Sequence, residues 1–226
     1  MVQLVLWDID HTLIDTRGVG RELSAAAFQR TTGLTMRKQA KIDGITEAVI
    51  FRETAKLQGL ATDREDFERF AAALAAEHLL QAADLRERGH ALPGAAAALE
   101  LLAADGIRQT VVTGNVRPVA EIKLQVFGLD QHILWNLGAY GEDDDQRSKL
   151  VKLALRRAQV SPADAVVIGD TPADVEAAHS SDVRVIAVAS GRSDEAALRD
   201  AGAETVLPDL RDTELLVKLV RGGDPR

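Results

Sequence analysis

The sequence predicts an α/β fold, a doubly wound parallel sheet into which an all-helical segment is inserted. Short apolar runs recur along the chain, and segments with helical patterning separate them. Such runs are typical of strands that helices cover on both faces of a parallel sheet. One stretch of about 70 residues has helical patterns but no convincing strand, and it is too long for a simple crossover. We therefore expect a sheet-based core and a helical cap.

The main strands are predicted at four nearly continuous apolar runs. These runs lie at residues 2–7, 110–112, 165–168 and 183–188, with a weaker run at 133–135 and a short edge strand at 205–207. Because helical segments separate the runs, the strands should form one parallel sheet with right-handed crossovers.

Proline, glycine and capping residues set the predicted helix boundaries. Pro93 suits the first turn of a helix that Gly106 ends, and further helices are expected at 116–127 and 149–158. In the inserted segment, one helix begins near Thr46. A second follows the capping-box sequence at residues 62–65 and has its apolar side chains at Phe67, Phe70, Leu74 and Leu79. The core is predicted at residues 1–15 and 90–226, and the cap at 16–89.

The composition argues against several classes of function. The 226 residues include 27 Lys and Arg against 35 Asp and Glu, a formal net charge of −8, which argues against nucleic acid or an anionic membrane as partner. The absence of cysteine excludes disulfides and thiolate chemistry. No stretch approaches the ~20 apolar residues of a membrane helix, and no signal-peptide core precedes Asp8. We expect a cytoplasmic monomer or homodimer.

Polar residues follow the predicted strands at the points where the strands end. Asp8 and Asp10 come after the first run, Thr113 after the second, and Asp170 after 165–168. Because the carboxyl ends of parallel strands share one edge of the sheet, these residues should meet. Clustered carboxylates need a cation, and oxygen ligands without cysteine or a histidine pair point to Mg²⁺ rather than zinc.

A magnesium ion beside hydroxyl, amide and basic groups suits the binding of a phosphoryl group. Asp8 would attack phosphorus and form an aspartyl-phosphate. Asp10, two residues further along the extended chain, would protonate the leaving oxygen and then deprotonate the hydrolytic water.

Three motifs resemble those of the haloacid dehalogenase (HAD) superfamily in order and spacing. They are Asp8-Ile9-Asp10-His11-Thr12-Leu13, Thr113-Gly114-Asn115 and Gly169-Asp170-Thr171-Pro172-Ala173-Asp174. The likeness spans nearly the whole chain and is greatest to the phosphoglycolate phosphatase branch, with the helical segment placed like that superfamily's first-type cap. The resemblance implies a Rossmann-like core.

The resemblance also implies roles for the motif residues. Asp8 would be the nucleophile and Asp10 the general acid and base. Mg²⁺ would be held by Asp8, the Asp10 carbonyl and Asp170, with Asp174 in support. Phosphate would be bound by Thr113, the Gly114 amide and Asn115. For Thr113, a role as the N-cap of the helix that follows is the structural alternative.

Two departures from the family pattern matter. The residue before Thr12 is most often glycine in the family, and here it is His11, whose role stays open. The phosphate-clamping lysine of the family is usually followed by Pro-x-Pro, and that string is absent. The clamp is assigned to Arg147, with Lys149 as the second choice, and an arginine would offer bidentate contacts. A solvated helix face is the alternative for either residue.

Substrate specificity is expected in the cap, at Gly44, Ile45 and Thr46. Gly44 permits a turn, and Thr46 would open a helix with its free amides towards the cleft. The segment resembles the Gly-x-Thr-Asp loop of phosphoglycolate phosphatase caps, although Glu47 replaces the aspartate. A plain N-cap at Thr46 is the alternative.

A Mg²⁺-dependent phosphomonoesterase acting on a small phosphorylated metabolite is the leading hypothesis, with phosphoglycolate the best single substrate. A sugar phosphomutase shares every core motif. A 2-haloacid dehalogenase is disfavoured because displacing a halide needs no acid at Asp10, and a non-catalytic binding module would be expected to lack Asp8 or Asp170. Lys123 is expected to be structural, and His78, His90, His132 and His179 are interpreted as surface or capping residues.

Overall fold

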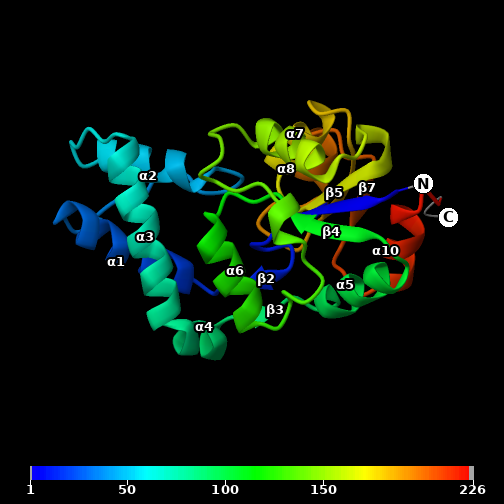
Figure 1. The fold of residues 1–226 in the computed structure, drawn as a ribbon, viewed down its shortest axis with the longest axis horizontal. Coiled ribbons are helices and arrows are strands. Elements are labelled where there is room, and N and C mark those ends of the chain that lie inside the picture. Colours follow the sequence, from blue (N-terminus) through cyan, green and yellow to red (C-terminus); the bar gives the residue numbers. More distant parts are fainter. Residues whose placement is uncertain (1, 224–226) are drawn as a thin grey trace.

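A computed structural model describes residues 2–223 and has a five-stranded parallel sheet at its centre (Figure 1). The strands are β1 (Leu4–Trp7), β4 (Arg108–Val111), β5 (Ala165–Gly169), β6 (Arg184–Val188) and β7 (Thr205–Leu207), and their order across the sheet is β4-β1-β5-β6-β7. Trp7, at the end of β1, lies opposite Val111 of β4 and Ile168 of β5. The predicted α/β fold class is confirmed.

Helices cover both faces of this sheet. On one face lie α5 (Ala95–Ala104), α6 (Arg117–Val126) and α10 (Thr213–Val220), and on the other lie α7 (Arg147–Ala158), α8 (Pro172–His179) and α9 (Glu195–Asp200). Val5 and Trp7 pack into the first core, whereas Leu4 and Leu6 pack into the second. Because side chains alternate along a strand, one short apolar run supplies both cores.

A helical group lies at one end of the molecule and forms the cap (Figure 1). It comprises α1 (Val19–Thr32), α2 (Glu47–Lys56), α3 (Arg64–Leu80) and α4 (Ala82–Arg88). Its core contains four phenylalanines, and the rings of Phe51 and Phe70 stack with centroids 4.5 Å apart. Val116 and Val119, at the start of α6, belong to the same cluster, so this end of the core supports the cap.

A two-stranded antiparallel sheet joins the cap to the core, and the sequence analysis did not predict it. It pairs β2 (Ile14–Asp15) with β3 (His90–Ala91). Strands of two residues carry too little periodicity to be found in a sequence. The two strands lie at residues 15 and 90, the predicted domain boundaries. The division into two domains at these residues stays a prediction.

Four local predictions were wrong. Pro93 precedes α5 and does not lie in its first turn, because the helix begins at Ala95 with Gly94 as its N-cap. Residues 133–135 form no strand: Ile133 makes only an isolated bridge to Gln109, and a 3₁₀ helix, η1 (Trp135–Leu137), follows. The capping box of α3 is one residue later than predicted, because Asp63 caps the helix with Asp66 as its partner. Leu79 is 68% exposed. A second 3₁₀ helix, η2 (Pro162–Asp164), precedes β5.

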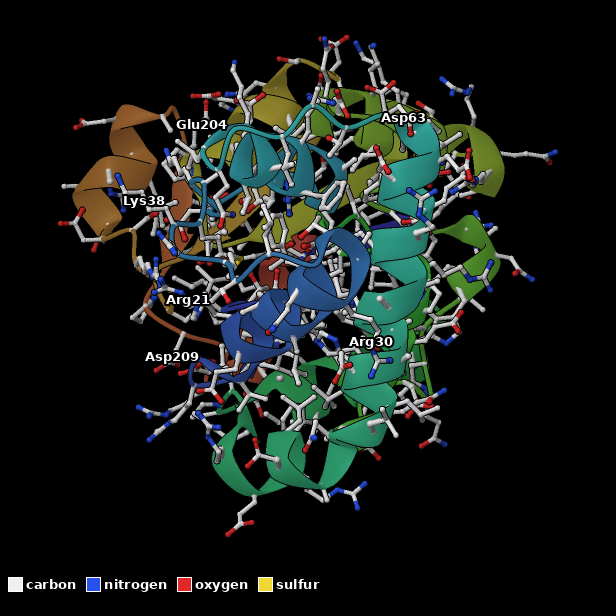
Figure 2. The ribbon with its side chains drawn as sticks, turned by 90° about the vertical axis from the view of Figure 1, so that its left-hand side faces the viewer. Arg21, Arg30, Lys38, Asp63, Glu204 and Asp209 are labelled. Carbon is white, nitrogen blue, oxygen red and sulfur yellow. The ribbon has the colours of Figure 1, made fainter. Side chains whose placement is uncertain are left out.

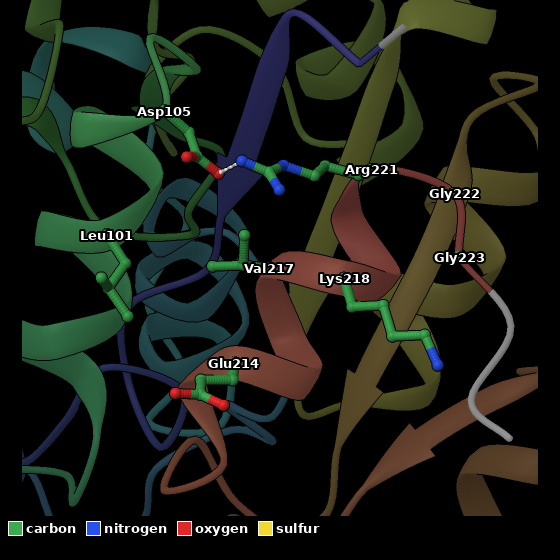
Figure 3. A pocket seen from close by; sticks show the side chains of 8 residues that line it. All are labelled: Leu101, Asp105, Glu214, Val217, Lys218, Arg221, Gly222 and Gly223. Carbon is green, nitrogen blue, oxygen red and sulfur yellow. Dashed lines mark ion pairs between the residues drawn. The ribbon is translucent and has the colours of Figure 1, made fainter.

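Two other regions of the described surface contain no predicted site residue. Exposed basic side chains project from the cap at Arg21, Arg30 and Lys38 (Figure 2). A cavity of about 650 Å³ lies between α5 and α10, where Arg221 pairs with Asp105 at 2.5 Å (Figure 3). No predicted site residue lines it. Among residues 2–223, no helix has the length and apolar character needed to cross a membrane.

Candidate active site

The candidate site lies where three neighbouring strands end. Asp8 follows β1, Thr113 comes two residues after β4, and Asp170 follows β5, and all three side chains are buried. Asp8, Thr113 and Asp170 line one cavity. The predicted meeting of these residues at the carboxyl edge of the sheet is therefore what the structure shows.

Three buried carboxylates form an acidic cluster at this edge. Asp8, Asp170 and Asp174 each place a carboxylate oxygen within 4.8 Å of the others. Thr12 donates its hydroxyl to Asp170 Oδ1 at 3.1 Å. Asp174 is also part of the capping box of α8, since its Oδ2 accepts from the Thr171 backbone amide at 3.1 Å and its own amide donates to the Thr171 hydroxyl oxygen at 3.3 Å. The capping role fixes the direction of this carboxylate.

The acidic cluster carries more negative charge than the protein around it offsets. Burial, followed by the charges of Asp8 and Asp174, raises the pKa of Asp170 well above its usual range. Burial also raises the pKa of Asp8, and Arg147 opposes that rise. Oxygen donors that are buried, close together and reluctant to ionise are a set that a divalent cation stabilises. The residues present therefore fit a hard cation such as Mg²⁺.

Arg147 is the cation of this cluster. Its guanidinium donates from Nη2 to Asp8 Oδ1 and from Nε to Asp174 Oδ1, the latter at 2.6 Å. Its side chain is 8% exposed. Lys149 instead extends to the surface, is 54% exposed and pairs with Asp144 at 3.4 Å. The structure thus places Arg147, and not Lys149, at the predicted phosphate-binding edge.

Asp10 lies beside the acidic cluster and has its own partners. Lys123 Nζ donates to both carboxylate oxygens at 2.8 Å, and Asn115 Nδ2 donates to Oδ2 at 2.7 Å. Burial alone would raise the pKa of Asp10, but the charge of Lys123 and the hydrogen bonds from Asn115 and Lys123 lower it below its ordinary value. The two catalytic candidates, Asp8 and Asp10, therefore sit in opposite electrostatic surroundings.

The predicted phosphate loop, residues 113–115, is tightly packed. Thr113 Oγ1 accepts from Asn115 Nδ2 at 2.8 Å. Thr113 is not the N-cap of α6, because that position belongs to Val116. A Cβ on Gly141 would lie 1.9 Å from the Gly114 carbonyl oxygen, and a Cβ on Gly114 would lie 2.3 Å from the Ile45 carbonyl oxygen. Both positions therefore need glycine because backbone passes so close.

The cap docks on the phosphate loop through residues 44–47. The Glu47 amide donates to the Gly114 carbonyl at 2.8 Å, and Gly44 has φ +70° with its α-carbon against Ala173. Gly44 and Ile45 line the cavity, whereas Thr46 does not. Thr46 is the N-cap of α2 but makes no side-chain capping bond, and its buried Oγ1 has no partner among residues 2–223.

His11 occupies a position that favours glycine. Its φ is +63°, in the left-handed region that residues other than glycine rarely adopt. Its carbonyl oxygen accepts from the Ser190 hydroxyl at 2.7 Å, and the residue lines the cavity. The side chain therefore lies where it can meet a ligand.

Among the other charged or polar residues that line the cavity are Lys123, Glu47 and His78, to which sequence reasoning gave no role in the site. Lys123 contacts Asp10 although only a structural role was expected. His78 is 2% exposed, so its assignment to the surface was wrong. A signal was present for both, because helical periodicity puts Lys123 in phase with buried Val119 and Ala120, and His78 with buried Leu74.

Comparisons with known proteins agree with this geometry. A family described as haloacid dehalogenase-like hydrolase matches residues 5–179, and one described as HAD-hydrolase-like matches residues 147–213. A search of curated proteins found no match.

Solved structures share the fold over nearly the whole chain. A hydrolase from Pseudomonas syringae is 24% identical, with a TM-score of 0.66 and coverage of 99% of this chain and 100% of that one. A predicted phosphatase from Clostridium acetobutylicum is 17% identical, with a TM-score of 0.70 and coverage of 98% and 99%. A predicted phosphoglycolate phosphatase from Haemophilus somnus is 16% identical, with a TM-score of 0.63 and coverage of 96% and 98%. At these identities, the likeness establishes the fold.

Proposed function

Because the chain belongs to the haloacid dehalogenase-like hydrolase family, we propose that it hydrolyses small phosphate monoesters through an aspartyl-phosphate on Asp8. The supporting observation is the division of the site into two parts. Asp8 lies in an acidic cluster with one arginine, and Asp10 lies beside it with a separate lysine. The lysine suits a group that must be ionised to take the proton of the hydrolytic water, and a cation at the acidic cluster would favour the ionised form of Asp8 that attacks phosphorus.

The first step forms one bond and breaks another. A carboxylate oxygen of Asp8 attacks phosphorus, and the bond from phosphorus to the leaving oxygen breaks. The protonated form of Asp10, which this step requires at its start, donates its proton to that oxygen and is left ionised. Arg147, Thr113 and the Gly114 amide would bind the phosphoryl oxygens. Mg²⁺, held by Asp8, the Asp10 carbonyl and Asp170 with Asp174 in support, would offset the charge of the phosphoryl group.

The second step releases phosphate. Water attacks phosphorus on the opposite side from Asp8, the bond between Asp8 and phosphorus breaks, and Asp10 accepts the proton of the water. Lys123 favours the ionised form of Asp10 that this step requires, because it donates to both carboxylate oxygens. The same pair keeps Asp10 in place between the two steps.

Release of inorganic phosphate tests this proposal. Asp8→Asn should reduce turnover by several orders of magnitude because the amide cannot attack phosphorus. Asp10→Asn should also lose activity, but without losing the nucleophile. Wild-type turnover by Asp8→Asn alongside an inactive Asp10→Asn would reverse the assigned roles. EDTA should abolish activity and Mg²⁺ restore it, and better restoration by zinc would contradict the oxygen-ligand argument.

Phosphoglycolate is the first substrate to assay, because the sequence most resembles that branch of the superfamily. A sugar phosphomutase is the second candidate, since it would need the same groups, Asp8 and Asp10. A sugar phosphate that yields an isomer without free phosphate would identify a mutase. Assay by phosphate release and product analysis on the same sample separates the two reactions.

A further inference from the structure

The cavity between cap and core is larger than a two-carbon acid requires. Its volume is about 1060 Å³, slightly above the roughly 300–1,000 Å³ of pockets that hold drug-sized ligands. The phosphoryl group would occupy only the part beside Asp8, Thr113 and Arg147. The cap side must therefore recognise the leaving group.

His78 presents an unused hydrogen-bond acceptor to this cavity. The side chain projects from α3, and its Nδ1 donates to the Leu74 carbonyl at 2.9 Å, since a carbonyl can only accept. Burial, with the nearby charge of Lys123, lowers the pKa of His78 to about 4, so the ring is neutral at pH 7. Nε2 is then an acceptor, and it is buried without a partner among residues 2–223.

Glu47 presents a second unused acceptor. Its side chain lines the same cavity from the first turn of α2. No hydrogen bond or ion pair within residues 2–223 involves its carboxylate, although the charges of Lys123 and Asp10 lie near enough to affect it. Burial raises the pKa of Glu47 to about 7 and Lys123 opposes the rise. At pH 8 the group is therefore mainly the carboxylate.

His78 Nε2 is buried without a donor among residues 2–223, and such a group destabilises a protein by about 1–3 kcal/mol until a ligand supplies the donor. The half-buried Glu47 carboxylate can accept from the same ligand. A hydroxyl group can donate to either acceptor. A carboxylate on the leaving group has no donor and would repel Glu47. An ammonium group would donate, but it would lie near the positive charge of Lys123.

We propose that Glu47 and His78 determine specificity by accepting hydrogen bonds from the leaving group, so that the enzyme selects hydroxyl-bearing phosphate monoesters over carboxylate-bearing ones. The proposal rests on the phosphatase function above. It moves the expected specificity residues from Gly44, Ile45 and Thr46, which dock the cap, to two other side chains that line the cavity. It also predicts that phosphoglycolate is a poor substrate.

A matched pair of substrates tests the proposal at pH 8 with Mg²⁺. Glycerol 3-phosphate and 3-phosphoglycerate differ by a hydroxymethyl group against a carboxylate, and phosphoethanolamine supplies an ammonium group. Wild-type kcat/KM should favour glycerol 3-phosphate over 3-phosphoglycerate at least tenfold. The wild-type kcat/KM for phosphoethanolamine should also be lower than that for glycerol 3-phosphate. Glu47→Gln should bring the first ratio to within about threefold, because the amide neither repels a carboxylate nor lacks a donor.

The control variant is Glu53→Gln, which changes the same residue type on the same helix, α2, at a surface position that does not line the cavity. It should leave the substrate ratio at the wild-type value. His78→Phe should lower kcat/KM on glycerol 3-phosphate relative to p-nitrophenyl phosphate, whose leaving group has no donor.

The outcomes separate the two proposals. A wild-type preference for 3-phosphoglycerate or phosphoethanolamine, or a ratio that Glu47→Gln does not change, would overturn the specificity assignment while p-nitrophenyl phosphate hydrolysis still supports a phosphatase. No release of phosphate from any of the esters would overturn the phosphatase function and the specificity assignment with it.

Discussion

Replacing Arg147 with alanine removes the one cation among residues 2–223 that pairs with the acidic cluster. Its guanidinium contacts Asp8 and Asp174, and all three side chains are less than a tenth exposed. Removing one member of a buried ion pair destabilises a protein by about 3–5 kcal/mol, because the partner charge stays buried. Here two carboxylates lose the same partner, so we expect a loss of about 4 kcal/mol in the free energy of unfolding without metal.

Activity should fall in parallel if Arg147 binds the phosphoryl group. We expect kcat/KM to decrease roughly 10²-fold or more, equivalent to about 2.7 kcal/mol of transition-state stabilisation. Arg147→Lys should restore part of the stability but less of the activity, since a lysine cannot make both contacts from one planar group. Urea unfolding in EDTA and phosphate release with Mg²⁺ measure the two effects.

Lys149→Ala is the matched control, because Lys149 lies two residues further along α7 and is mostly exposed. Its surface pair with Asp144 should contribute about 0–1 kcal/mol. A larger loss of activity from Lys149→Ala than from Arg147→Ala would move the clamp to Lys149. Wild-type stability and activity in Arg147→Ala would refute the reasoning for Arg147 altogether.

Three further predictions follow from single contacts. Lys123→Met should lower the free energy of unfolding in urea by about 2–3 kcal/mol, less than for a fully buried pair because the Asp10 side chain is about one-third exposed. The acid limb of the kcat–pH profile should also move to higher pH, and an unchanged profile would show that Lys123 does not set the pKa of Asp10. The folded-state pKa of His78 is lowered to about 4, so the unfolded chain binds more protons than the folded chain between pH 4 and 6.5, and the contribution of His78 to stability falls by about 2 kcal/mol from pH 7 to pH 5. The free energy of unfolding of His78→Phe should lack this pH dependence, and the same pH dependence in variant and wild type would contradict the lowered pKa. Gly141→Ala should lower the free energy of unfolding by about 1–3 kcal/mol because its Cβ would overlap a backbone carbonyl, whereas Gly20→Ala, within α1, should be neutral or stabilising. Equal shifts of the two variants in thermal unfolding would contradict the close approach at Gly141.

Local patterns in the sequence were sufficient for the sheet and for the meeting of the motif residues. The apolar runs before Asp8, Thr113 and Asp170 identified strands, and parallel strands have their carboxyl ends at one edge. Short connections then leave little choice of arrangement. The inserted helical segment was predicted from its length, which excluded a simple crossover.

Only the tertiary structure decided which side chains around this edge face one another. Arg147 and Lys149 open the same helix, and the packing of α7 turns the first inward and the second to solvent. Lys123 meets Asp10 across 113 residues of chain, and Glu47 and His78 share a cavity because the cap docks at Gly114. Helical periodicity shows which face of a helix is buried, but the partner of a buried polar side chain depends on how the elements pack.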